Sequence, residues 1–144
     1  RPADQRQSVV NIGGITVLDD SYNANPLSME MAFRSAKQIA GNHYFLVLGD
    51  MGELGRFEEK LHYETGVKAG KIGFDGLITV GPLSRFLAKG AEQGGMKNVV
   101  TCDTCEEAAE KLMKMAAPGD VVLVKGSHYM HMERIPAVLR GEKA

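Results

Sequence analysis

Short apolar runs alternate with helix-like segments along almost the whole chain, and this alternation constrains the fold more than any other feature of the sequence. Three of the runs, FLVLG, LITVG and VVLVKG, are apolar at nearly every position. Such runs are typical of strands buried on both faces, whereas a strand with one wet face alternates apolar and polar residues. The sequence therefore predicts an α/β fold, with a parallel sheet between two layers of helices.

The expected elements follow from the spacing of apolar residues and from start and stop signals. SVVNIGGITVLDD can form an antiparallel hairpin that turns at Gly13-Gly14, ahead of a mostly parallel sheet. We expect one Rossmann-like domain over residues 1–144, with residues 1–8 leading into it. Strands are expected at residues 14–20, 43–50, 76–81, 98–103 and 120–127. Helices are expected from Pro26 to Ala40, over about 57–69, over 84–95, after a capping box of Thr104 and Glu107, and over 130–141 with an interruption at Pro136.

The composition excludes several classes of protein. The chain is 44% hydrophobic and 24% charged, which indicates a globular fold. Its net charge of −1 gives no electrostatic basis for binding nucleic acid or an anionic membrane surface. No apolar run reaches the roughly 18 residues of a membrane span. The start, RPADQRQ, has neither Met nor the form of a signal peptide, so we expect a processed chain or a piece of a longer protein.

The two cysteines form the motif CDTC, Cys102 to Cys105. A C-x-x-C motif that enters a helix can be a redox pair whose thiolate the helix N-terminus stabilises. The alternative is that Cys102 ends a strand and Cys105 begins a helix by chance. We favour this alternative because the chain has no second cysteine pair for zinc and no flanking residues typical of thioredoxin-like sites. Two cysteines without a secretion signal fit the reducing cytoplasm.

Polar side chains gather where three of the expected strands end. In α/β folds, ligands bind beyond the carboxyl ends of the strands, near helix N-termini. Carboxylates accept hydrogen bonds from ribose hydroxyls, asparagine side chains donate and accept, and lysine supplies a positive charge for phosphate or carboxylate. The residues at these strand ends are Asp19, Asp20, Ser21, Asn23 and Asn25, then Asp50, Met51 and Glu53, then Lys125, Gly126 and Ser127.

Helix capping is the alternative reading of these residues. Asp and Asn commonly cap helices, and Asn25-Pro26 suits a helix start without any ligand. The coincidence of three loops favours a binding site. The sequence has no G-x-x-x-x-G-K-[ST] loop for ATP phosphates, and the glycines of GDMGELG do not match G-x-G-x-x-G. The phosphates of a nucleotide would therefore have to be held elsewhere.

Three motifs in this order, DDSYNANPLSM, LGDMGELG and VKGSHYMHME, resemble the C-terminal domain of the Mur ligases. The resemblance runs from about Gly14 to Arg140. Enzymes of this family have a first domain for the uridine nucleotide substrate, a central domain with the phosphate loop and magnesium ligands, and a third domain that closes the site. The resemblance implies that this chain is only the third domain, which agrees with the missing phosphate loop.

The resemblance is greatest to the family members that add D-alanyl-D-alanine to UDP-N-acetylmuramoyl-tripeptide in peptidoglycan synthesis. It implies that ATP phosphorylates the tripeptide's terminal carboxylate and that the dipeptide's amine attacks the acyl phosphate. The central domain would be a partner of this domain and would hold most of the phosphate and magnesium contacts. The implied nucleotide-binding residues are Asp20, Asn23 and Asn25, and the implied substrate-binding residues are Asp50, Lys125 and Ser127, with Lys125 also a candidate for a catalytic role.

The sequence also suggests roles for three histidines. His62 matches a histidine commonly found there in the family. We expect it to pack or cap, because a lone helical histidine without ligand-spaced partners is rarely catalytic. His128 and His131 have an i, i+3 spacing that can bind a metal, but no Asp, Glu or Cys pattern supports a site, so we expect no metal centre.

Two other functions stay open. The chain could be a free-standing α/β module that binds a nucleotide or a partner without chemistry of its own. It could also be a domain of another Mur or folylpolyglutamate-type ligase, which shares the architecture but should lack DSYNANP. A phosphate loop upstream in the same gene would decide for a ligase.

Overall fold

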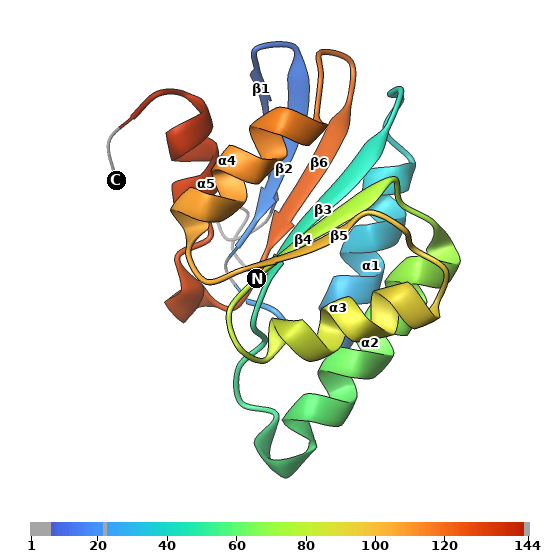
Figure 1. The fold of residues 1–144 in the computed structure, drawn as a ribbon. Coiled ribbons are helices and arrows are strands. Elements are labelled where there is room, and N and C mark those ends of the chain that lie inside the picture. The colour runs from blue at the N-terminus through green and yellow to red at the C-terminus, as the bar shows by residue number, and fades with distance from the viewer. Residues whose placement is uncertain (1–6, 22, 143–144) are drawn as a thin grey trace.

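One mixed sheet forms the centre of the molecule (Figure 1). The computed structural model describes residues 7–21 and 23–142. Within them, six strands lie in the order β1-β2-β6-β3-β4-β5. All neighbouring pairs are parallel except β1 and β2, which are antiparallel, so the predicted sheet is confirmed. The strands are β1 (Ser8–Ile12), β2 (Ile15–Asp20), β3 (Tyr44–Gly49), β4 (Gly76–Val80), β5 (Val99–Cys102) and β6 (Val121–Lys125).

The predicted N-terminal hairpin is present and turns where expected. Ile12 pairs with Ile15, which leaves Gly13 and Gly14 as the two turn residues. Their φ angles are 58° and 90°, and a two-residue hairpin turn with two positive φ angles is the geometry that favours glycine. β1 already begins at Ser8, inside the segment expected to lead into the domain, and residues 1–6 lie outside the described residues.

The helices cover both faces of the sheet, as predicted (Figure 1). The first three pack on one face, because their apolar residues join one core with alternate residues of the strands. The last two pack on the opposite face and join the core formed by the remaining strand residues. The helices are α1 (Pro26–Lys37), α2 (Glu58–Ile72), α3 (Ser84–Gln93), α4 (Cys105–Met115) and α5 (Arg134–Leu139).

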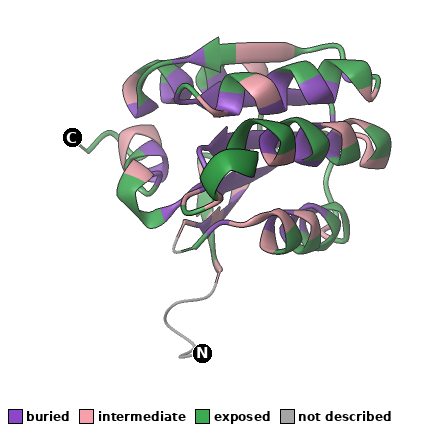
Figure 2. Ribbon diagram, turned by 90° about the horizontal axis from the view of Figure 1, so that it is seen from below, coloured by how far each residue is buried: buried purple, intermediate pink, exposed green. Residues whose placement is uncertain are grey.

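The two cores explain the continuous apolar runs of the sequence. In β3, Leu46 and Leu48 face the core beneath α1, whereas Phe45 and Val47 face the core beneath α4. Successive side chains of a strand point to opposite faces, so a strand covered on both sides needs apolar residues at every position. In Figure 2, the buried residues gather in the sheet, and the helices carry both buried and exposed residues.

The chain after β6 differs from the single interrupted helix that the sequence predicts over 130–141. A short 3-10 helix, η3 (His128–Met130), comes first, and α5 begins only at Arg134. His131 separates them because it adopts a left-handed conformation with a φ of 52°. Pro136 is the third residue of α5, where a backbone N–H has no helical partner to lose, so this proline does not interrupt the helix.

The remaining helix boundaries differ from the expected ones by a few residues. α1 ends at Lys37, before the expected Ala40, and α2 runs on to Ile72, beyond the expected Ala69. A second 3-10 helix, η2 (Gly55–Phe57), leads into α2. Helix ends fray and are the least sequence-determined part of a helix.

The strand order places three loops side by side. The chain returns through α4 to insert β6 between β2 and β3, so the carboxyl ends of β2, β6 and β3 are neighbours in the sheet. From β2 and β3 the chain continues into α1 and α2 on one face, whereas from β6 it continues toward α5 on the other. Such a point, where successive loops diverge to opposite faces, is where α/β folds place their ligands.

Candidate functional site

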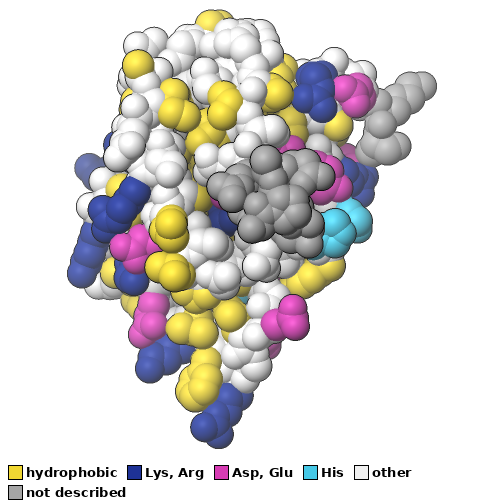
Figure 3. Space-filling view, turned by 180° about the vertical axis from the view of Figure 1, so that it is seen from behind, with side chains coloured by type: hydrophobic (Ala, Val, Ile, Leu, Met, Phe, Trp, Pro, Cys, Tyr) yellow, Lys and Arg dark blue, Asp and Glu magenta, His cyan; other side chains and the backbone are white. Residues whose placement is uncertain are grey.

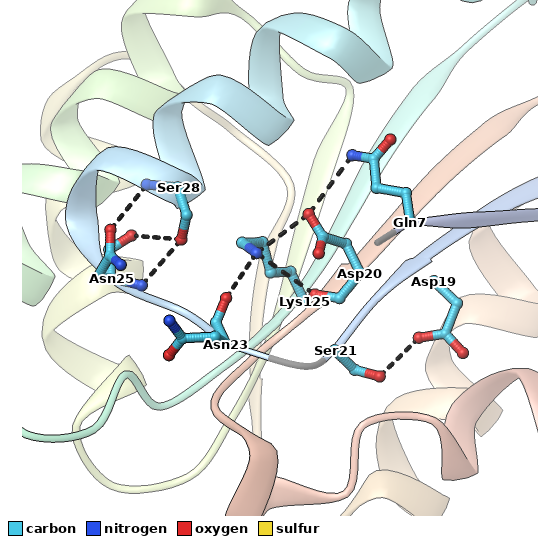
Figure 4. A network of polar contacts seen from close by, with 8 residues as sticks. All are labelled: Gln7, Asp19, Asp20, Ser21, Asn23, Asn25, Ser28 and Lys125. Carbon is cyan, nitrogen blue, oxygen red and sulfur yellow. Dashed lines mark hydrogen bonds and ion pairs between the residues drawn. The ribbon is translucent and has the colours of Figure 1, made fainter. Parts of the chain in front are cut away.

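A buried ion pair forms the centre of this edge of the sheet (Figure 4). The Lys125 ammonium nitrogen lies 3.1 Å from Oδ2 of Asp20, and the two side chains are only 2% and 10% exposed. The same nitrogen donates to the carbonyl oxygen of Asn23 at 2.9 Å and to that of Asp20 at 3.5 Å. Lys125 therefore joins the end of β6 to the end of β2 and to the loop that follows it.

The strand register explains why these two residues meet. Asp20 pairs with Lys125 in neighbouring parallel strands, and both side chains point to the face covered by α1, as Leu18 and Leu123 do. Gln7 also approaches the carboxylate, with Nε2 3.4 Å from Oδ2 of Asp20. Among the described residues, Gln7 and Lys125 both contact Oδ2 of Asp20, which leaves Oδ1 to a further donor.

Asp19 points to the opposite face of the sheet and has different surroundings. Burial raises the pKa of the Asp19 carboxyl, and Glu133 and Asp20 raise it further. The Ser21 hydroxyl donates to Oδ1 of Asp19 at 2.7 Å, and this bond together with Arg140 acts in the opposite direction. Only Asp20 of the two acids therefore belongs to the cluster around Lys125.

The two asparagines of the loop after β2 have unequal positions. Asn25 is the N-cap of α1: its side-chain oxygen accepts from the Ser28 backbone N–H at 2.9 Å, and the Ser28 hydroxyl accepts from the Asn25 N–H at 3.0 Å. This is the capping alternative that the sequence left open. Asn23 is exposed, and its carbonyl oxygen is the acceptor for Lys125. The nucleotide-binding role of both residues stays a prediction.

Asp50 lies at the end of β3 but is directed at α3. Its Oδ1 accepts from both the backbone N–H and the hydroxyl of Ser84 at 2.7 Å, and its Oδ2 accepts from the Leu83 N–H at 3.3 Å. A carboxylate at a helix N-terminus satisfies free N–H groups and interacts favourably with the helix dipole. These contacts favour an anchoring role for Asp50, and substrate binding by this residue stays a prediction.

Ser127 adds a buried hydroxyl to the same edge. Its backbone N–H donates to the carbonyl oxygen of Asp50 at 2.9 Å, which ties the loop after β6 to the loop after β3. The Ser127 side chain is buried, and its Oγ has no hydrogen-bond partner among the described residues. Most buried hydroxyls are paired, so the Ser127 hydroxyl stands out at this edge of the sheet.

His62 fixes the loop after β3, in agreement with the expected packing or capping role. Its Nε2 accepts from the Met51 backbone N–H at 2.9 Å, and its Nδ1 lies 2.6 Å from the Glu58 carbonyl oxygen. A carbonyl only accepts, so Nδ1 carries the proton and the ring is the neutral tautomer. Both ring nitrogens are therefore used inside the fold.

The cysteines and the other histidines were candidates for a redox pair and a metal site. Cys102 ends β5 and Cys105 begins α4, and both are buried free thiols. Burial raises the pKa of Cys102, and it raises the pKa of Cys105 to about 11, so neither thiolate is stabilised. Within the described residues, His, Cys, Asp and Glu form no group of three or more that could hold a metal, including around His128 and His131.

The structure thus brings Asp20, Lys125 and Asn23 together, whereas Asn25 and Asp50 are engaged at helix ends. Sequence reasoning missed two participants, Gln7 and Ser84. Gln7 lies before β1, and only the hairpin register carries it next to Asp20. Ser84 follows a different strand, and no local signal links it to Asp50, which is distant in the sequence.

Other surface features lie away from this edge. One hollow is lined by His43, Asp75, Lys97 and Asn98, which lie at the opposite, amino-terminal edge of the strands. The face shown in Figure 3 carries acidic and basic side chains interspersed, in keeping with the small net charge. In the described part of the chain, the helices are too short or too polar to cross a membrane.

Comparisons with known proteins show which family this chain belongs to. The family model described as "Mur ligase, glutamate ligase domain" matches residues 5–128. The UDP-N-acetylmuramoyl-tripeptide–D-alanyl-D-alanine ligase of Bacillus subtilis is 36% identical over 85% of this chain. The ligase of the same name from Treponema pallidum is 36% identical over 99% of it. The chain spans only 27% and 31% of the lengths of these two relatives.

Solved structures give the same result. The crystal structure of the MurF ligase of Thermotoga maritima in complex with ADP matches 96% of this chain with a TM-score of 0.82 and 27% sequence identity. A MurF structure from Acinetobacter baumannii matches 99% of the chain with a TM-score of 0.85 and 29% identity. The chain covers 31% and 32% of those two proteins.

Proposed function

The chain belongs to the Mur ligase family, and from this premise we propose that it is the C-terminal domain of the ligase that joins D-alanyl-D-alanine to UDP-N-acetylmuramoyl-tripeptide. The relatives that carry this name match most of this chain but are about three times as long, so the proposal concerns a longer protein. The resemblance to the Mur ligases, which the sequence motifs predict, is confirmed for the family. The alternative of a sister ligase has less support, because the relatives from Bacillus subtilis and Treponema pallidum both carry the name of the dipeptide-adding ligase.

The proposed reaction proceeds through an acyl phosphate. The terminal carboxylate of the tripeptide takes the γ-phosphoryl group of ATP, the amine of the dipeptide attacks the activated carbonyl, and phosphate leaves as the amide forms. Such a reaction depends mainly on positioning the reactants and offsetting charge. An enzyme that uses ATP and a uridine nucleotide would act in the cytoplasm, where both compounds are supplied.

The proposed contact with the nucleotide rests on Asp20. Its carboxylate lies at the carboxyl end of β2, where one oxygen is held by Lys125 and the other is available to a donor. A fixed carboxylate of this kind suits a ribose hydroxyl, and the relative of known structure from Thermotoga maritima was crystallised with ADP. Asn23 lies on the same loop with an exposed side chain that can reach the nucleotide or the domain junction, whereas Asn25 holds the start of α1.

Ser127 is the best candidate for contact with the incoming dipeptide. Its unpaired buried hydroxyl lies in the loop after β6, next to the loop after β3. It can donate to a carboxylate or accept from an ammonium group, and the dipeptide has both. Asp50 supports this region indirectly, because it ties the β3 loop to α3.

The described residues do not form a metal site of their own. They contain no group of three or more metal-binding side chains, and the Asp20 carboxylate is already compensated by Lys125. A magnesium ion that accompanies ATP is held by the phosphates and by one or two carboxylates, so its place depends on where the phosphates are bound, and this sequence has no phosphate loop. We therefore assign those contacts to the central domain, the proposed partner of this one.

The test replaces Asp20 in the full-length ligase. A charged hydrogen bond to a hydroxyl is worth ~1.5–3 kcal/mol. Asp20→Ala should therefore raise the Michaelis constant for ATP by about ten- to a hundredfold, as that energy implies. The constant for D-alanyl-D-alanine should change far less.

Asp19→Ala is the matched control, because it removes the neighbouring acid from the opposite face of the strand. It should leave the ATP constant close to the wild-type value. A normal ATP constant in a folded Asp20→Ala variant, with the fold verified by circular dichroism, would contradict the assignment of Asp20 to the ribose.

A further inference from the structure

We propose that Lys125 is a positioning residue, whose ammonium group holds the Asp20 carboxylate and the β2–α1 loop in the geometry that binds the nucleotide. This inference rests on the proposed function, because it gives Lys125 a task in the same site. It replaces the simpler expectation that Lys125 faces the reacting groups.

Three contacts tie Lys125 to β2 and the loop that follows it. Its Nζ lies 3.1 Å from Oδ2 of Asp20, 2.9 Å from the carbonyl oxygen of Asn23 and 3.5 Å from the carbonyl oxygen of Asp20. An ammonium group has three donors and no acceptor, so each of these oxygens can accept from it. Two of these oxygens belong to the backbone, so the lysine also fixes the path of the loop (Figure 4).

Burial separates Lys125 from any substrate. Its side chain is 2% exposed, and it extends from the last residue of a strand at the centre of the sheet. A cation that met an acyl phosphate or a dipeptide carboxylate would have to leave Asp20 unpaired in a buried place, which is strongly unfavourable. The geometry therefore favours a lysine that acts through Asp20.

Stability alone does not account for this pair. Buried ion pairs often stabilise a protein no better than apolar residues of similar volume would, because desolvation offsets the attraction. The neighbouring strand positions are occupied by apolar residues such as Leu18, Val124 and Leu123. An ion pair at the last position of both strands instead fixes the orientation of one carboxylate at the edge where ligands bind.

The lysine and the helix cap together define the loop. Lys125 holds the loop at Asp20 and Asn23, and the capping box of Asn25 and Ser28 holds it where α1 begins. With Oδ2 engaged, the Asp20 carboxylate presents Oδ1 in one orientation. Pre-organisation of this kind lowers the entropy that a ligand would otherwise have to remove on binding.

The experiment uses the full-length ligase with three variants: Asp20→Asn, Lys125→Met and the double variant Asp20→Asn/Lys125→Met. Methionine keeps an unbranched side chain of similar length but has no charge. Lys125→Met should raise the Michaelis constant for ATP by about ten- to a hundredfold, as Asp20→Ala does, and should change kcat and the dipeptide constant far less. This split between constants is the readout that a general loss of fold would not produce.

The double variant keeps the test valid if Lys125→Met leaves too little folded protein, because it removes both charges and leaves neither one unpaired. If Lys125 acts through Asp20, the double variant should match Asp20→Asn in kcat and in both Michaelis constants. A further loss of kcat in the double variant, or a fall in kcat with a normal ATP constant in Lys125→Met, would overturn the inference while leaving the proposed function intact. An inactive wild-type ligase would instead contradict the proposed function, and with it the premise of this inference.

Discussion

Asp19 and Asp20 are neighbours in β2, yet the alternation of a strand gives them different roles. Asp20 is paired with a buried ammonium group, whereas Asp19 is partly buried on the face of α5, near Glu133. Desolvation and a nearby negative charge both disfavour the ionised form of a carboxyl group. Asp19 therefore destabilises the fold when it is charged, although Ser21 and Arg140 offset part of this cost.

The first prediction concerns Asp19→Asn and its dependence on pH. The pKa of Asp19 in the folded chain is raised above its ordinary value of 3.8, so the folded state binds this proton more tightly than the unfolded state. The stability that protonated Asp19 contributes is fully present below pH 3.8, the ordinary pKa, and is lost as the pH rises through the raised pKa of the folded chain. Asparagine keeps an acceptor for Ser21 without the charge. Asp19→Asn should therefore melt at a higher temperature than the wild type at pH 7, and the difference should shrink as pH falls toward 4.

Glu64→Gln is the control for this measurement, because it removes one acid from an exposed position in the middle of α2. It should show no comparable change between pH 7 and pH 4. A lower melting temperature for Asp19→Asn at pH 7 would mean that favourable contacts of the carboxylate outweigh its desolvation.

At the residue scale, part of the site follows from the sequence and part does not. Strand alternation is enough to predict that only one of Asp19 and Asp20 faces the cluster, and Asn25-Pro26 is enough to place a helix start. The partner of Lys125 is not predictable, because it depends on a β6 strand that inserts between β2 and β3. The bonds of Asp50 to Ser84 likewise arise between loops that are brought together only by the sheet.

At the scale of elements, α2 and α3 are packed against each other through glycines. A Cβ atom added to Gly66 of α2 would overlap the carbonyl oxygen of Leu87 in α3, and one added to Gly90 would overlap the carbonyl oxygen of Tyr63. A Cβ at Gly70 would lie 2.6 Å from the Ala91 carbonyl oxygen. The two helices therefore approach with their backbones nearly in contact.

The second prediction replaces Gly66 by alanine. In an open helix this change stabilises by about 1 kcal/mol, because alanine is the better helix former. Here the added methyl group would push α2 away from α3, and overpacking of this kind costs roughly 1–3 kcal/mol. Gly66→Ala should thus lower the free energy of unfolding, measured by urea denaturation. Lys60→Ala, on an exposed position of the same helix, should change it by no more than about 0.5 kcal/mol.

A Gly66→Ala variant as stable as the wild type would show that the two helices have room to separate.

The close contact between α2 and α3 could not be predicted from the sequence. Apolar spacing predicts both helices, and the strands that precede them, because it reflects burial directly. It does not predict how closely two helices approach, and it does not predict that His131 would break the last helix by adopting a left-handed conformation.

At the scale of the whole molecule, the proposed function makes this edge of the sheet only one side of a nucleotide site. The ion pair lies at the ends of β2 and β6, and the exposed Asn23 and the unpaired hydroxyl of Ser127 lie on the loops that follow these strands. The sequence contains no phosphate loop, and the described residues contain no metal-binding group of three or more side chains. The proposal therefore gives this chain the contacts to a ribose and a dipeptide, and gives the charge of the triphosphate to the central domain.

The last prediction concerns the chain as it stands. One charged hydrogen bond contributes ~1.5–3 kcal/mol, whereas a dissociation constant of about 1 mM already requires about 4 kcal/mol. The chain alone should therefore bind ATP with a dissociation constant of about 1 mM or weaker, and it should release no phosphate above background when ATP, the muramoyl tripeptide and D-alanyl-D-alanine are all present.

Calorimetry with two ligands makes this test specific. Adenosine carries the ribose and the base without the phosphates, so if this chain contacts only the ribose side, adenosine and ATP should bind equally weakly. Micromolar binding of ATP together with undetectable binding of adenosine would mean that this chain holds the phosphates itself. Turnover by the isolated chain would lead to the same conclusion, because acyl phosphate formation cannot proceed unless the triphosphate is held and its charge is offset. Either result would contradict the assignment of those contacts to a separate central domain.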